Sequence, residues 1–163
     1  MAQIIPFKGL RYSEAKVGDL SKVMTPPYDI ISQTEQEQYY NMHDYNIIRL
    51  ELGKEEPGDN EYNNKYIRAS QYLNSWIEQQ VLIKESQPSL YIYQQKFRLS
   101  DGTEYTRTGF VGLVRLEEFS KGIILPHENT LSKPKADRLQ LMRACGANFS
   151  QIFVLYDDPE KTV

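Results

Sequence analysis

The spacing of apolar residues changes several times along this chain, and each change predicts a different element. Short apolar runs at residues 4–7 and 9–12 predict an edge strand, since proline is tolerated at a sheet edge. Longer runs at residues 90–99 and 105–116 flank the turn sequence Ser100-Asp101-Gly102-Thr103 and predict a β-hairpin. Residues 46–52 alternate as a half-buried strand does, and residues 151–156 predict a last apolar strand.

Three other segments predict helices, and two of them have the three- and four-residue apolar spacing of an amphipathic helix. Ser32 and Glu35 form a capping box, which predicts a helix over residues 33–42. Asp59 is the expected N-cap of a long helix, and residues 136–147 predict a third helix with Lys135, Asp137 and Arg138 in its first turn. The stripe of the long helix consists of Tyr62, Tyr66, Ala69, Leu73, Trp76, Ile77 and Gln80.

These elements predict a single α+β domain over residues 1–163. We expect a mixed or mainly antiparallel sheet with a central long hairpin and about three packed helices. Because an apolar strand is followed by a charged segment at residues 157–163, we also expect this domain to be the N-terminal part of a longer protein.

Composition narrows the classes of function. The net charge of −3 argues against general electrostatic binding to nucleic acid, because such binding needs a basic face on the protein. No run of eighteen apolar residues and no N-terminal export signal occurs, so we expect a cytoplasmic protein that does not enter a membrane. Cys145 is the single cysteine, which excludes an internal disulfide. It lies near the end of an apolar helical segment, where we expect it to be a small core residue.

The densest group of polar side chains follows Pro126 and leads into the third helix. Arg138 can clamp a phosphate through paired donors, and the lysines add positive charge. Glu128 can orient or deprotonate an attacking hydroxyl group, with His127 as its partner. The candidate residues in this group are His127, Glu128, Thr130, Lys133, Lys135 and Arg138.

Two other interpretations of this group stay open. His127-Glu128 is the first half of a zinc hydrolase motif, but Leu131 stands where the second histidine belongs. Alternatively, the residues satisfy backbone groups in a tight loop, and Asp137 pairs with a neighbouring cation on a solvated helix turn. No glycine-rich loop ending in Lys-Ser or Lys-Thr is present, so the chain has no P-loop.

A second candidate is the segment Pro26-Pro27-Tyr28-Asp29, in which two prolines fix the pose of Tyr28 and Asp29. We favour a structural role in which Tyr28 fills the core and Asp29 caps the following helix, unless this loop lies beside the His127 loop. Arg11 is a cation that could join either site.

Several of these motifs together resemble the bacterial and archaeal family called domain of unknown function 1015. The resemblance covers nearly the whole chain and rests on Pro6-Phe7-Lys8-Gly9-Leu10-Arg11, Pro26-Pro27-Tyr28-Asp29-Ile30-Ile31, Tyr91-Ile92-Tyr93, Leu125-Pro126-His127-Glu128-Asn129-Thr130 and Lys135-Ala136-Asp137-Arg138. It implies a longer parent protein, genes that neighbour the phosphoserine route to serine, and a distant kinship with ParB and sulfiredoxin. That kinship implies a nucleotide-binding fold with Glu128 and Arg138 near the phosphates.

We therefore hypothesise a nucleotide- or phosphate-binding domain, in one form a small-molecule phosphotransferase linked to serine or amino-acid metabolism. A nucleotide with Mg²⁺ is the expected cofactor, because the ion screens phosphate charge. The alternative hypothesis is a non-catalytic regulatory or protein-interaction domain, with exposed tyrosines as a partner surface.

Overall fold

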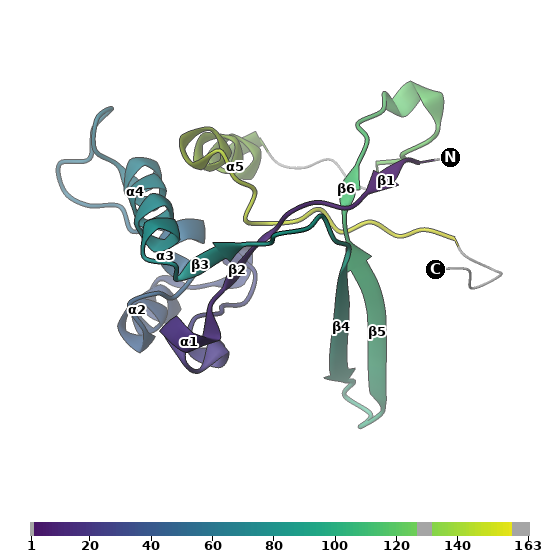
Figure 1. Cartoon of the computed structure of the whole chain (residues 1–163), viewed down its shortest axis with the longest axis horizontal. Coiled ribbons are helices and arrows are strands. Elements are labelled where there is room, and N and C mark those ends of the chain that lie inside the picture. The colour runs from purple at the N-terminus through teal and green to yellow at the C-terminus, as the bar shows by residue number, and fades with distance from the viewer. Residues whose placement is uncertain (1, 127–131, 158–163) are drawn as a thin grey trace.

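The helices of this protein gather on one side and most of its strands on the other. A computed structural model describes residues 2–126 and 132–157, apart from the side chain of Lys133. Figure 1 shows the helices grouped together, with the hairpin and a small strand pair at the opposite side. The helices are α1 (Glu14–Val17), α2 (Gln33–Met42), α3 (Ile48–Glu51), α4 (Lys65–Glu78) and α5 (Ser132–Cys145).

The strands form three antiparallel pairs, which confirms the α+β class and places the strands in small separate sheets. Strand β1 (Ile4–Ile5) pairs with β6 (Leu113–Val114), and β2 (Leu10–Tyr12) pairs with β3 (Leu82–Lys84). The predicted hairpin is confirmed as β4 (Tyr91–Arg98) and β5 (Glu104–Val111). Its turn is closed by a backbone hydrogen bond between Leu99 and Thr103, and Gly102 takes the positive φ that the turn requires.

Gly112 ends β5 earlier than the apolar run predicts and lets β1 and β6 approach the hairpin. A Cβ atom at this position would lie 2.8 Å from Leu90 Cδ2 and 3.0 Å from Ile4 Cγ2. At Gly109, three residues earlier, a Cβ atom would meet nothing within 4 Å. The close packing at Gly112 therefore joins the hairpin to the β1–β6 pair.

Replacing Gly112 with alanine should lower the free energy of unfolding by about 1 kcal/mol, because the Leu90 and Ile4 side chains must shift to admit the methyl group. Gly109→Ala is the matched control and should cost nothing measurable. Urea unfolding followed by circular dichroism tests the pair, and equal losses in the two variants would contradict the packing assigned to Gly112.

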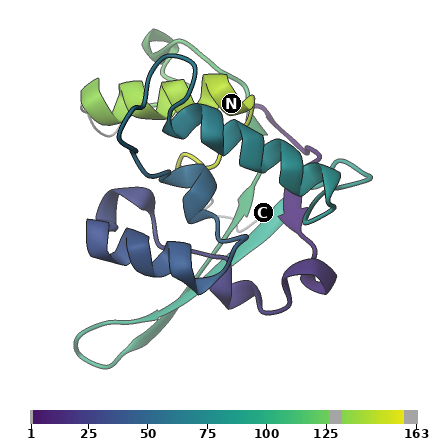
Figure 2. The same cartoon turned by 90° about the vertical axis from the view of Figure 1, so that its left-hand side faces the viewer.

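The core lies between the helices and the β2–β3 pair. Asn64 caps α4 by accepting hydrogen bonds from the backbone N–H groups of Tyr66 and Ile67. The predicted apolar stripe then buries Ala69, Leu73 and Trp76. Cys145 of α5 packs against the core cluster that contains Leu73 and Trp76. Figure 2 shows α4 and α5 lying along each other, and they are in contact.

Some predicted elements are wrong. Residues 48–51 of the strand predicted at 46–52 form α3, and residues 151–156 belong to no strand within the part of the chain that the structure describes. Asp59 does not cap α4, since that position belongs to Asn64. Helix α5 begins at Ser132, so Asp137 and Arg138 lie in its second turn. Ser32 rather than Asp29 caps α2, which excludes the capping role expected of Asp29.

Candidate functional site

Arg138 is the central side chain of the candidate site. Its guanidinium carbon lies 3.8 Å from the centre of the Tyr28 ring, as in a stacked cation–π contact. Its Nε and Nη2 atoms donate to Asp137 Oδ2 over 3.0 and 2.6 Å. The Nη1 atom is buried and has no hydrogen-bond partner among residues 2–126 and 132–157. One edge of the guanidinium is thus fixed, and a donor remains on the other side.

Asp137 joins the start of α4 to α5. Its Oδ1 atom accepts a hydrogen bond from the Tyr66 hydroxyl over 2.8 Å and pairs with Lys65 Nζ over 3.1 Å. Burial alone would raise the pKa of this carboxyl group, but hydrogen bonds from Arg138, Tyr66 and Lys65 outweigh burial and lower the pKa. Asp137 is therefore ionised at neutral pH and holds Arg138 in its orientation.

Glu51, at the end of α3, is a carboxyl group that the sequence did not single out. The Ser150 hydroxyl donates a hydrogen bond to Glu51 Oε1. Burial raises the pKa of Glu51 and the negative charge of Asp29 raises it further, whereas Ser150 and Arg138 act in the opposite direction. Because its pKa is raised, Glu51 binds a proton more readily than an ordinary glutamate does, so it is a candidate acid–base group.

Two hollows meet at Arg138. A crevice of about 10 Å³, roughly the room that one water molecule needs, lies among Glu51, Lys65, Tyr66 and Arg138. A groove of about 430 Å³ runs along α5, with Tyr28, Lys135 and Arg138 in its lining. The volume of this groove falls in the range typical of small-molecule sites.

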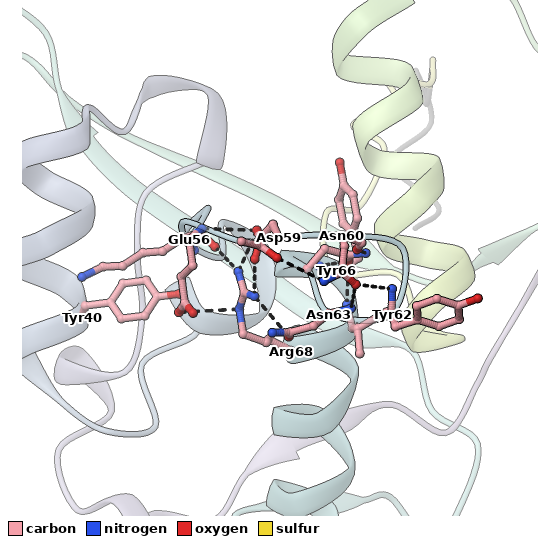
Figure 3. A network of polar contacts seen from close by, with 12 residues as sticks. Tyr40, Glu56, Asp59, Asn60, Tyr62, Asn63, Tyr66 and Arg68 are labelled. Carbon is pink, nitrogen blue, oxygen red and sulfur yellow. Dashed lines mark hydrogen bonds and ion pairs between the residues drawn. The ribbon is translucent and has the colours of Figure 1, made fainter.

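The loop before α4 is held in place by Arg68, as Figure 3 shows. The two terminal nitrogens of Arg68 donate to the Asp59 carboxylate over 2.6 and 3.0 Å, and Nη2 also donates to the Lys54 carbonyl over 2.8 Å. These contacts fix residues 54–64 next to the first turn of α4. Lys65 and Tyr66, which begin that turn, are thereby held where they reach Asp137.

The structure brings together three of the residues that the sequence singled out. Arg138 and Lys135 line the groove, and Asp29 adjoins Tyr28 and is close enough to Glu51 to affect its pKa. Arg11 lies elsewhere, in an ion pair with Glu85, and its side chain is mostly exposed. His127, Glu128, Thr130 and the side chain of Lys133 lie outside the described residues.

The alternative expectations for this region are met in part. Asp137 does pair with a neighbouring cation, Arg138, as expected for a charged helix turn. Tyr28 is half-buried, and its ring lies against the Arg138 guanidinium. The sequence missed Glu51 and Ser150, because neither lies near the polar group after Pro126 and neither belongs to a motif.

Comparison with known proteins decides the family. The model of the family described as "Protein of unknown function (DUF1015)" matches residues 4–163, nearly the whole chain. The chain belongs to the DUF1015 family. Membership confirms the resemblance drawn from the Pro-Pro-Tyr-Asp and His-Glu motifs, and it assigns no activity. Neither the curated proteins nor the solved structures include a significant match to this DUF1015 chain.

The sequence also predicts that this DUF1015 protein does not enter a membrane, and the length and apolar character of its helices bear on that prediction. Within residues 2–126 and 132–157, no helix combines the length and the apolar character that crossing a bilayer demands.

Proposed function

We propose that Arg138 is the centre of a phosphate-binding site, and that this protein binds a nucleotide or another phosphorylated small molecule. The observation that carries the proposal is the guanidinium geometry. Asp137 and Tyr28 hold Arg138 rigidly, while its buried Nη1 atom has no hydrogen-bond partner in the described part of the chain. Leaving a buried donor without a partner costs about 1–3 kcal/mol, more for a charged group, and a phosphate oxygen that displaced the atoms covering Nη1 would supply that partner.

The charges around Arg138 support an anionic ligand. Lys135 lines the groove, and Lys65 lines the crevice that also borders Arg138. In the sequence, His127, Glu128 and Thr130 come just before α5 and Lys133 lies within its start, and we propose that all four are neighbours of the phosphate.

The proposal extends to phosphoryl transfer, with a hydroxyl compound of amino-acid metabolism such as serine as the acceptor. Glu51, whose pKa is raised by burial, could take the proton from the acceptor hydroxyl. A nucleotide would bring Mg²⁺, which proteins usually hold through one or two carboxylates besides the phosphate oxygens. Asp29, whose charge raises the pKa of Glu51, is a carboxylate that could supply one of these ligands.

A protein-interaction domain is the second candidate function. It is favoured by apolar side chains that stand exposed on the hairpin and beyond it, such as Ile92 with 76% of its surface exposed and Leu116 with 92%. Monomeric proteins rarely expose large contiguous apolar patches unless these serve in binding. This function does not require the free donor on Arg138.

Titration calorimetry with ATP, ADP, phosphoserine and inorganic phosphate, with and without Mg²⁺, tests the phosphate site. At least one ligand should bind to the wild type, and Arg138→Ala should weaken that binding at least about tenfold. Arg138→Lys keeps the charge but loses the fork of donors, so it should restore part of the affinity.

Arg143→Ala is the matched control, because Arg143 is an exposed arginine of the same helix that does not line the groove. It should bind as the wild type does, and circular dichroism should show all variants folded. Equal binding by wild type and Arg138→Ala would overturn the phosphate site. Failure of the folded protein to bind any of these ligands would do the same. In either case the protein-interaction domain would remain as the candidate function.

A further inference from the structure

The groove beside Arg138 is far larger than a phosphate group needs. Its volume is about 430 Å³, and its lining comes mostly from α5, from Pro134 to Met142, and from the segment that follows the helix. A phosphate bound at Arg138 and Lys135 would fill only part of it. The rest of the groove is therefore available to another part of the ligand, and its lining indicates the chemistry of that part.

Most of the remaining lining is apolar. It comes from one face of α5 and from the residues after it, namely Pro134, Leu139, Met142, Ala147, Phe149 and Ile152. Leu139 and Met142 are each 44% exposed although they face this groove, so they are only partly covered by described residues. Covering such surface is favourable by roughly 25 cal/mol per Å².

The polar atoms of the groove lie among these apolar groups. Asn148 lines it and carries a side-chain amide that can both donate and accept, as is needed to pair with the edge of a purine base. Phe149 provides an aromatic ring against which a flat base can stack, and the sulfur of Met142 is suited to contact an aromatic ring. The lining thus combines two cations with a mainly apolar surface that carries the Asn148 amide and the Ser150 hydroxyl group.

We propose that the ligand is a nucleoside phosphate, with its phosphate at Arg138 and its base in the apolar part of the groove. This inference rests on the proposed phosphate site and names its ligand class. A phosphorylated amino acid fits less well, because its ammonium and carboxylate groups would lie against Leu139 and Met142 and lose hydration without a partner. A purine buries a flat, largely apolar surface there and can use Asn148.

Calorimetry with AMP, ribose 5-phosphate, phosphoserine and inorganic phosphate tests this inference, since AMP and ribose 5-phosphate differ by the base alone. AMP should bind at least about tenfold more tightly than ribose 5-phosphate or phosphoserine. Leu139→Ser and Met142→Ser should each weaken AMP binding severalfold and leave the affinity for inorganic phosphate unchanged. Gln140→Ser, at an exposed position of the same helix outside the groove lining, should change neither affinity.

The outcomes separate this inference from the phosphate site. Binding of inorganic phosphate that depends on Arg138, combined with equal affinities for AMP and ribose 5-phosphate, would overturn the nucleotide and keep the phosphate site. Phosphoserine binding as tight as AMP binding would do the same. Absence of binding by all four probes would overturn both. If one serine variant fails to fold, the other still decides the role of the groove.

Discussion

Replacing Trp76 with alanine is expected to lower the free energy of unfolding by about 4 kcal/mol, the usual cost of removing a large buried aromatic side chain. Trp76 is 2% exposed and is surrounded by other rings. Tyr45 meets it edge-on with ring centres 5.7 Å apart, and Tyr12 and Tyr72 lie at 6.2 and 6.1 Å. Alanine would leave a cavity where α4 meets β2 and the segment before α3.

Unfolding in urea followed by far-ultraviolet circular dichroism measures this loss, because the variant has no tryptophan left for fluorescence. Tyr62→Ala is the control, since it also removes an aromatic ring but at a position that is 80% exposed. It should change the free energy of unfolding by less than about 0.5 kcal/mol. A loss below about 1 kcal/mol for Trp76→Ala would mean that the aromatic cluster is not the centre of the core.

The elements that could be predicted from sequence are those fixed by neighbouring residues. The bounds of α2 follow from a capping box in which Ser32 and Glu35 exchange hydrogen bonds within one turn. The hairpin likewise follows from a local turn in which Asp101 accepts a hydrogen bond from the Thr103 N–H. Both signals depend on contacts that the chain makes with itself over a few residues.

The strand predicted at residues 46–52 failed because its alternation is also compatible with a short helix. The deciding interactions are those of Asn46, which is fully buried. Its amide donates to the Lys22 carbonyl over 2.8 Å, and its oxygen accepts from the Ile48 N–H over 3.0 Å at the start of α3. Because Lys22 is far from Asn46 in sequence, the local pattern contains no sign of this contact.

Only part of the candidate site could be predicted from the sequence. Arg138 and Lys135 stood out because cations gather before and within α5, a local property of the sequence. Glu51 could not be found, since its raised pKa arises chiefly from burial and further from the negative charge of the distant residue Asp29. The error at residues 46–52 also hid it, because a half-buried strand would have turned the side chain of Glu51 towards solvent.

Asp137→Asn is expected to cost about 2 kcal/mol at pH 7, since hydrogen bonds to charged groups are worth about 1.5–3 kcal/mol and the site is partly exposed. Asparagine keeps one acceptor oxygen but removes the charge that Lys65, Tyr66 and Arg138 share. Calorimetric or urea unfolding measures the loss. Asp44→Asn is the control, because the Asp44 side chain is 98% exposed and its ion pair with Arg49 spans 3.8 Å. It should change stability by less than about 0.5 kcal/mol.

The pH dependence gives a second and independent measure of Asp137. Its pKa in the folded protein lies below the ordinary value of 3.8, so the folded state binds fewer protons than the unfolded state in the interval between the two. The stabilisation from its charge is complete above pH 3.8 and is lost as the pH falls through the pKa of the folded state. The gap between wild type and Asp137→Asn should therefore be constant from pH 5 to 7 and should close in more acidic solution. A gap that stays constant throughout would show that the charge of Asp137 does not hold α4 and α5 together, and would remove the support that fixes Arg138 for a ligand.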